Sequence, residues 1–274
     1  MVARRRSPHM TILVMLAIIA SACGTAEASP QRAEVAPSPT STSTSTTTST
    51  STSTSTTSST PPTTIPNPHE TLTAAARSSV TSLVAYDSPN GERISLPFQV
   101  PNPHQFGGPL TLMVTEGAKD DDWVKVQLPI RPNGTEAWIP TADYRITSTV
   151  IWAEVDLSTT SVKVFSDGEL IQESQAAIGA EETPTPIGTF YVAAKRLNPP
   201  EEAHLGTWAL VLSSFSETLP SFSGGLPVIA IHGENDPDRV LGEAISNGCV
   251  RVSNEVIQFL AAYVPLGAPV IISA

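Results

Sequence analysis

The chain has 274 residues and carries 26 acidic against 15 basic side chains, which gives a formal net charge of −11. An acidic chain has no field that attracts phosphate backbones, and this excludes a general nucleic-acid-binding role. Its two cysteines, Cys23 and Cys249, are too few for a disulfide framework.

The N-terminus has the pattern of an export signal. Three arginines at 4–6 precede an apolar run over 10–20, which is short for a membrane span and typical of a secretory signal. The small residues before Cys23 resemble a lipobox. We therefore predict a signal over 1–23, lipidation of Cys23 and a protein at the extracytoplasmic face of the membrane or in the cell wall. Ordinary cleavage after Ala22 stays open, and it would export the protein without a lipid.

Residues 24–77 are biased toward serine, threonine and proline, and the stretch 40–60 is almost purely serine and threonine. Such a composition offers too little apolar surface to offset the entropy of ordering. We predict a disordered linker here. The roughly 200 residues that follow are enough for two modest domains with cores of their own.

The first predicted domain covers 78–147. Its composition favours short strands at 80–86, 110–115, 123–128 and 136–139, separated by turn clusters at 87–91 and 131–134. Short strands joined by tight turns predict a small β-barrel. Residues 128–140 resemble the Src-homology-type domain found before bacterial cell-wall catalytic domains. Trp123 and Trp138 can line a ligand groove or pack in the core, and the core is the favoured interpretation.

The second predicted domain covers 150–274 and is mainly β with one clear helix. Alternating or β-rich segments predict strands at 150–156, 161–165, 169–178, 208–212, 228–232 and 268–273, and residues 183–192 predict a rigid turn that enters another strand. The dipeptide at 167–168, Asp-Gly, indicates a hairpin. Asn254 can cap a helix that runs to about residue 263, with apolar residues at 256, 260 and 264.

Cys249 is a thiol without a disulfide partner, and it lies in the segment 246–251, Ser-Asn-Gly-Cys-Val-Arg. A lone cysteine with a histidine elsewhere in the chain is a candidate nucleophile and base. His232 is the favoured base because it ends an apolar strand and precedes Gly233. His204, in a polar stretch, is its rival. The alternative for Cys249 is an inert buried cysteine.

The segments 155–165, 185–190, 231–233 and 246–251, in this order, resemble the L,D-transpeptidase (YkuD-type) catalytic domain over nearly the whole of 150–273. The resemblance implies a β-sandwich-like fold after the β-barrel-like domain. It also implies an enzyme that forms 3→3 cross-links between peptidoglycan stem peptides through a thioester on Cys249. His232 would be the base, and the Gly233 carbonyl would orient its ring. Carbapenems are implied as covalent inhibitors, and no cofactor is expected.

Roles for the other residues of the cysteine segment follow less directly. The N–H groups of Gly248 and Cys249 can face a tetrahedral oxyanion. Asn247 stands where many relatives carry a second histidine, and it can donate a hydrogen bond but cannot titrate. Arg251 either holds a carboxylate of the donor or forms a structural salt bridge, and Ser246 is expected to shape the turn.

Two alternatives remain open. A carboxypeptidase-type hydrolase would use the same thioester with water as acceptor, and a wall-binding lipoprotein would be inactive. A papain-like peptidase is disfavoured because there the cysteine precedes the histidine. No metal site is expected, because the histidines are not spaced like metal ligands. The histidines in question are His69, His104, His204 and His232.

Overall fold

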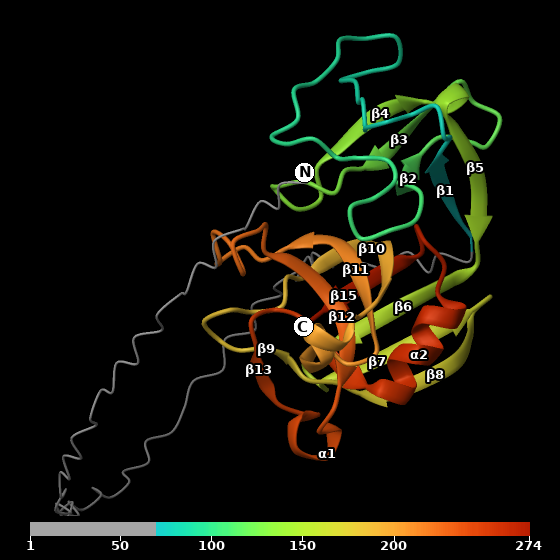
Figure 1. Cartoon of the computed structure of the whole chain (residues 1–274). Helices are drawn as coiled ribbons and strands as arrows, with labels where there is room; N and C mark the ends of the chain where they lie inside the picture. The colour runs from blue at the N-terminus through green and yellow to red at the C-terminus, as the bar shows by residue number, and fades with distance from the viewer. Residues whose placement is uncertain (1–69) are drawn as a thin grey trace, which may run out of the picture. The chain divides into compact units, whose positions relative to one another are not determined.

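The computed structural model describes residues 70–274, which form a mainly β structure, as predicted. A five-stranded sheet comes first in the chain, and an eight-stranded and a two-stranded sheet follow (Figure 1). The predicted signal over 1–23, the lipidation of Cys23 and the linker as far as residue 69 lie outside the described residues. Within 70–274, no helix is both long and apolar enough to cross a membrane.

The first sheet has the strand order β4-β3-β2-β1-β5, and all its pairs are antiparallel. Strands β2, β3 and β4 lie where the sequence predicted strands, and the sheet encloses a core of its own that includes Leu112, Val124 and Ile139. Its resemblance to a Src-homology-type domain stays a prediction. The strands are β1 (Thr71–Ala76), β2 (Thr111–Glu116), β3 (Trp123–Gln127), β4 (Glu136–Pro140) and β5 (Tyr144–Thr149), with the 3-10 turn η1 (Thr141–Asp143) before β5.

Strand β1 corrects the predicted linker boundary at residue 77. Its three alanines have a low strand propensity, and its two threonines continue the composition of the linker, so the local pattern hid it. Pairing on both sides overrides this preference, since β1 lies between β2 and β5 and Ala74 is fully buried. The domain therefore begins at Thr71 at the latest.

The predicted strand at 80–86 is a second correction, because this segment makes only isolated bridges. Ser82 pairs with Pro101, and Tyr86 pairs with Arg93 and Trp138. The partner of this segment changes from Pro101 at Ser82 to Arg93 and Trp138 at Tyr86, so the bridges do not join into a ladder. Strand β5 was not predicted.

The second sheet has the order β14-β12-β11-β10-β15-β6-β7-β8. Two of its pairs, β12 with β14 and β15 with β6, are parallel. Its strands are β6 (Ile151–Asp156), β7 (Ser161–Ser166), β8 (Glu169–Gln175), β10 (Gly188–Leu197), β11 (Trp208–Phe215), β12 (Val228–Glu234), β14 (Val250–Ser253) and β15 (Pro269–Ser273). The two-stranded sheet consists of β9 (Ile178–Gly179) and β13 (Ala244–Ser246).

The predicted hairpin at 167–168 joins β7 to β8. Asp167 has φ 49° and Gly168 has φ 85°, which are the two positive values that a type I′ turn needs. The predicted strand over 169–178 is interrupted, because β8 ends at Gln175 and β9 begins at Ile178 to pair with β13.

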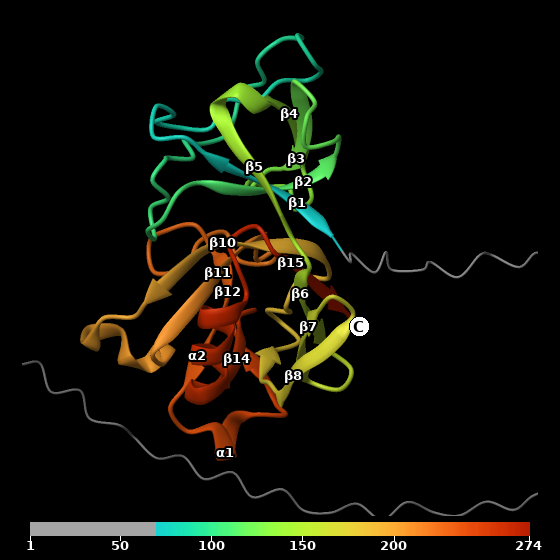
Figure 2. The ribbon, with the colours of Figure 1, turned by 90° about the vertical axis from the view of Figure 1, so that its right-hand side faces the viewer.

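Helix α2 (Asn254–Tyr263) packs against β11, β12 and β14 (Figure 2). Its buried face carries Val256, Ile257 and Leu260, close to the predicted spacing. Its N-cap is Ser253 rather than Asn254, since the Ser253 hydroxyl accepts the Val256 N–H. Two further short helical segments are η2 (Pro200–Leu205) and α1 (Pro237–Val240).

The two larger sheets share contacts through β10 and β11. Tyr191 and Ala193 of β10 belong to the apolar core of the first sheet. The Gln127 side chain donates to the Thr189 carbonyl at 2.7 Å and accepts from the Ser213 hydroxyl at 2.9 Å. The first sheet thus packs on the face of β10 and β11 that is turned away from the core under α2.

Candidate active site

The face of β12 and β14 that is turned away from the α2 core carries His232 and Arg251. Ile229 and Ile231 of β12 are buried in that core, and the alternation of a strand turns His232 to the other side. On β14 the core residues are Val250 and Val252, which turns Arg251 the same way. The parallel register places His232 opposite Arg251 and Ile231 opposite Val250.

Continued by one residue, this register places Cys249 opposite Ala230, two residues before His232 on the neighbouring strand. From the spacing of strands and residues, the Cα atoms of Cys249 and His232 are about 8 Å apart. His232 therefore lies on β12, and Cys249 lies directly before the neighbouring strand β14, on the same face. Within the described residues, no hydrogen bond joins their side chains, and such contacts commonly tighten only when substrate binds.

Cys249 is a free, half-buried thiol. Burial raises the pKa of the thiol, while a hydrogen bond from the Ala230 backbone and the charge of Arg251 act in the opposite direction. The resting side chain is thus a neutral thiol at neutral pH, and it needs a base to become a nucleophile.

His232 is buried, with 5% of its surface exposed, and its Nδ1 lies 2.9 Å from the Gly233 carbonyl oxygen. A carbonyl can only accept, so Nδ1 carries the proton and Nε2 keeps a free lone pair. Burial lowers the pKa of His232, and the charge of Arg251 lowers it further, against opposing contributions from the Gly233 carbonyl and from Glu234. The imidazole is therefore neutral at pH 7 and able to accept a proton.

The turn before Cys249 depends on Ser246 and Gly248. The Ser246 hydroxyl accepts the Gly248 N–H at 3.1 Å and donates to the Cys249 carbonyl. Gly248 has φ +105°, and a Cβ at this position would lie 2.9 Å from Ile229 Cδ1. Ser246 thus closes the turn, as expected. The Gly248 N–H, which we predicted can face an oxyanion, donates to Ser246 in this structure, and its part in the reaction stays a prediction.

A second loop braces the same turn from the other side. The Thr183 hydroxyl donates to the Ser246 carbonyl at 3.0 Å, and the Ala180 N–H donates to the same oxygen at 2.9 Å. Thr185 accepts the Gly179 N–H through its hydroxyl at 2.9 Å. Ala180 and Thr183 thus help to position the turn before Cys249, and Thr185 supports their loop through its bond with Gly179.

Arg251 forms the salt bridge that the sequence left as one of two options. Its Nη1 lies 3.2 Å from Glu234 Oε2, and only 9% of Glu234 is exposed. Burial alone would raise the pKa of Glu234, but hydrogen bonds from the Asp236 amide and from Arg251 outweigh it and keep this pKa below its usual value. Among the described residues, Arg251 Nε is a buried donor without a hydrogen-bond partner.

Glu234 was missed by the sequence analysis. The sequence signal for Glu234 was its position two residues after His232, which puts both on the same face of the strand. A carboxylate buried there needs a cation as partner. Thr183 was missed as an individual residue too. Its contact with Ser246 spans 63 positions in the chain, and nothing in the sequence predicts that pairing.

Asn247 and His204 lie at the margin of the site. Asn247 is exposed at the tip of the turn. His204 is exposed on η2, close enough for its charge to lower the pKa of His232 slightly. The end of η2 packs against the site, because a Cβ on Gly206 would lie 2.4 Å from the Gly233 Cα. Within residues 70–274, no group of three or more histidine, cysteine or acidic side chains is placed to hold a metal ion.

The sequence model of the YkuD family, described as the L,D-transpeptidase catalytic domain, matches residues 151–272. This segment contains the whole candidate site. The YkuD proteins of Bacillus licheniformis and Bacillus subtilis (strain 168) are each 29% identical to this chain over 119 residues. These matches cover 43% of this chain and 63% of the relatives, so they span less than two thirds of the relatives' length.

The structure is also similar to that of L,D-transpeptidase 3 from Mycobacterium tuberculosis in complex with a faropenem-derived adduct. The identity is 14% and the TM-score is 0.38, and the match covers 60% of this chain and 91% of that one.

Proposed function

We propose that this chain is an L,D-transpeptidase of the cell wall, with Cys249 as nucleophile and His232 as general base. The family match over 151–272 supports the reaction class. The observation that carries the assignment of residues is a neutral His232 on β12, oriented by the Gly233 carbonyl, with the free thiol of Cys249 directly before the neighbouring strand β14.

The first half of the reaction forms a thioester. His232 Nε2 takes the thiol proton, and the Cys249 sulfur attacks the carbonyl of the diamino acid in a donor stem peptide. The bond to the terminal D-alanine breaks, and its amine leaves with the proton from His232. Since the Gly248 amide is engaged by Ser246, we assign the oxyanion to the Cys249 N–H.

The second half transfers the acyl group. An amine of a neighbouring stem peptide gives a proton to His232 and attacks the thioester, which forms a 3→3 link between diamino acids. The Cys249 sulfur leaves as a thiolate and recovers its proton from His232. Arg251 braces Glu234 at the end of β12, and we assign to the exposed Asn247 an amide hydrogen bond to substrate.

Mass analysis of muropeptides after incubation with the purified protein tests this function. Two joined stems with one D-alanine lost from the donor are the expected product. Single stems that have lost D-alanine would instead indicate a carboxypeptidase-type hydrolase that uses water as acceptor. If the muropeptides are unchanged although the protein is folded, the remaining interpretation is an inactive wall-binding protein.

Reaction with a β-lactam is a second test of the same thiol, because a strained β-lactam amide imitates the amide that acylates Cys249. We expect a carbapenem to add to Cys249, visible as a mass increase of the intact protein. An active enzyme without an adduct would contradict an open cleft around the thiol.

We also propose export and attachment to the membrane through a lipid on Cys23. The expected observation is a diacylglycerol mass on the N-terminal peptide of the mature protein. If the mature protein begins at Cys23, carries no lipid and is soluble, secretion without a lipid anchor is the remaining interpretation.

A further inference from the structure

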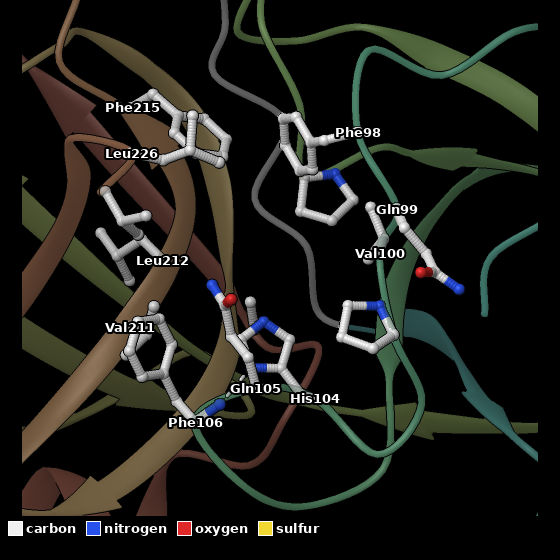
Figure 3. A pocket seen from close by; sticks show the side chains of 14 residues that line it. Phe98, Gln99, Val100, His104, Gln105, Phe106, Val211, Leu212, Phe215 and Leu226 are labelled. Carbon is white, nitrogen blue, oxygen red and sulfur yellow. Dashed lines mark hydrogen bonds between the residues drawn. The ribbon is translucent and has the colours of Figure 1, made fainter. Parts of the chain in front are cut away.

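The ladder between β11 and β12 is interrupted at two places, and the two gaps are filled differently. At one place the register shifts between Val211 and Phe215. Beside this shift lies a cavity of about 50 Å³, which Figure 3 shows with Leu212 and Phe215 on one side and Phe98 of the first domain on the other. The other interruption directly follows His232, and a single polar side chain of α2 fills it.

Asn254 inserts its side-chain amide into the ladder at this second place. Two residues on, the register that pairs Ala209 with His232 would place Thr207 opposite Glu234. Instead, the Thr207 N–H donates to Asn254 Oδ1 at 2.8 Å, and Asn254 Nδ2 donates to the Glu234 carbonyl at 3.2 Å. A backbone N–H only donates and a carbonyl only accepts, so these partners also fix which end of the amide is which. The Asn254 side chain therefore replaces the missing pair and joins β12 to the segment that follows η2.

Two glycines leave room for this amide. A Cβ on Gly206 would lie 2.5 Å from Asn254 Oδ1, and a Cβ on Gly233 would lie 2.3 Å from the same oxygen. A side chain at either position would therefore displace the amide. Gly233 is also the residue whose carbonyl accepts the Nδ1 proton of His232. Because the amide contacts Gly233 and bonds to the carbonyl of the next residue, it holds the peptide group that orients the base.

A second amide extends the same connection. Asn254 Nδ2 also donates to Asn235 Oδ1 at 2.9 Å, and Asn235 Nδ2 donates to the Ala203 carbonyl at 2.6 Å. Ala203 lies in η2 and Asn235 directly follows β12, so the two amides connect η2 to the residues after His232. The N-cap of α2 is Ser253, and the Asn254 side chain is therefore not needed to begin the helix.

We propose that Asn254 is a positioning residue for the base, and that its amide holds the Gly233 peptide group, whose carbonyl keeps the proton of His232 on Nδ1. The proposal deepens the proposed function and rests on it for the role of His232 as base. Without the amide, the Thr207 N–H and the Glu234 carbonyl lose their partner, and the backbone after His232 is held by β14 alone. The ring can then turn, and a proton on Nε2 leaves that nitrogen unable to accept the thiol proton.

The tautomer of His232 is measured directly by ¹⁵N NMR of the imidazole rings in purified protein at pH 7, with its signals assigned by their absence from His232→Ala. In wild-type protein we expect the proton on Nδ1, where the Gly233 carbonyl accepts it. Asn254→Ala should show a mixture of both tautomers, since the carbonyl is no longer held in place. An Asn254→Ala spectrum with the proton on Nδ1 alone overturns the proposal.

Single-turnover acylation of Cys249 by a stem tetrapeptide measures the consequence for the reaction. In Asn254→Ala the rate constant at saturating peptide should fall about tenfold, a part of the roughly 10² to 10⁴ that general-base catalysis contributes, with the half-saturating peptide concentration unchanged. The Gly233 carbonyl also raises the pKa of His232, so its loss should move the acid limb of the pH profile to lower pH. The charged groups that act on this ring are the same in both proteins, namely Arg251 of β14, Glu234 of β12 and His204 of η2. A wild-type rate and a wild-type acid limb together overturn the proposal.

Ser253→Ala is the matched control, because Ser253 is the neighbouring polar side chain and caps α2 through the Val256 N–H. Loss of a cap destabilises the fold, so thermal unfolding should occur at a lower temperature in this variant. The tautomer of His232, the acylation rate and the acid limb should stay as in the wild type. Equal changes in Ser253→Ala and Asn254→Ala would mean that a general loosening of α2 causes them, and this overturns the proposal.

Asn254→Asp decides the case in which Asn254→Ala does not fold. It has the same size and keeps an acceptor for the Thr207 N–H, but it cannot donate to the Glu234 carbonyl. The mixture of tautomers is expected here too, and a proton on Nδ1 alone overturns the proposal. Failure of the proposed function gives a different result, because wild-type protein then forms no thioester with the peptide. The comparison of tautomers needs no substrate, so it still decides the role of Asn254.

Discussion

The two halves of the candidate site are held in different ways. His232 belongs to a regular strand with neighbours on both sides, and the carbonyl of the next residue orients its ring. Cys249 follows a tight turn that depends on a glycine at φ +105° and on the hydroxyls of Ser246 and Thr183. The base is thus fixed by backbone pairing and the nucleophile by a few side-chain contacts. Substitutions near Cys249 should therefore be tolerated less well than substitutions around the base.

The largest effect is expected from Cys249→Ala. With the sulfur removed, no thioester can form, so cross-linked product should be absent in the muropeptide assay. Circular dichroism and thermal unfolding should show a folded protein, because a half-buried thiol contributes little to packing. Product formed by this variant would end the assignment of the nucleophile.

Removal of the base should have the next largest effect. His232→Ala is expected to lower the single-turnover rate of Cys249 acylation by about 10² to 10⁴, the range for loss of general-base catalysis. The loss should shrink as the pH approaches the pKa of the thiol, since thiolate then forms without help. Single-turnover acylation of Cys249 at several pH values measures this loss of rate.

His204→Ala is the control for this comparison, because His204 is exposed beside the site. Its acylation rate should stay near that of the wild type at each pH. If His204→Ala showed the larger, pH-dependent loss, the two histidines would have to exchange roles.

The turn is tested by Gly248→Ala against Gly224→Ala. Both glycines have positive φ, so each substitution should cost about 1–2 kcal/mol of unfolding free energy. Gly248→Ala should cost more, because its new Cβ meets Ile229 Cδ1, whereas nothing lies within 4 Å of a Cβ at Gly224. Denaturant unfolding measures the difference, and equal losses would show that the crowding at Gly248 is unimportant.

The smallest effect is expected from the charges near His232. Arg251 lowers the pKa of His232 and Glu234 raises it. The base works as a neutral imidazole, so activity falls as the pH drops through this pKa. Arg251→Gln removes a positive charge, raises the pKa and moves this acid limb to higher pH. Glu234→Gln should move it to lower pH.

Both variants should change the rate at pH 7 little, because the neutral imidazole already predominates there. The pH profile of kcat/KM for acylation measures the two shifts. Shifts of the same sign would show that these substitutions disturb the strand rather than the charge at the base.

Sequence pattern predicted the regular half of the site better than the turn. The apolar run over 228–231 followed by His232 located the strand and its polar end, and the alternation at 123–127 located β3. The role of Gly248 could not be predicted, because it depends on which acceptor its amide meets. The Arg251–Glu234 pair required the parallel register of β12 and β14, which alternation alone does not specify.

The same limit explains the errors in the first domain. Strand β1 is stabilised by neighbours at 111–116 and 144–149, far along the chain, and its alanines give no local signal. The segment 80–86 has good local propensity, but its pairing partners change between Ser82 and Tyr86 and no continuous ladder forms. In both cases the partner strand, and not the segment itself, determined the outcome.

The central claim, that Cys249 carries the acyl group, is tested most directly by mapping the covalent intermediate. Purified protein is mixed with a stem tetrapeptide without acceptor, quenched in acid and digested, and the peptide that contains Cys249 is analysed by mass spectrometry. The account predicts a tripeptide acyl group on Cys249, formed with release of D-alanine and absent from Cys249→Ala protein. An acyl group on another residue, or turnover with unmodified Cys249, would contradict it.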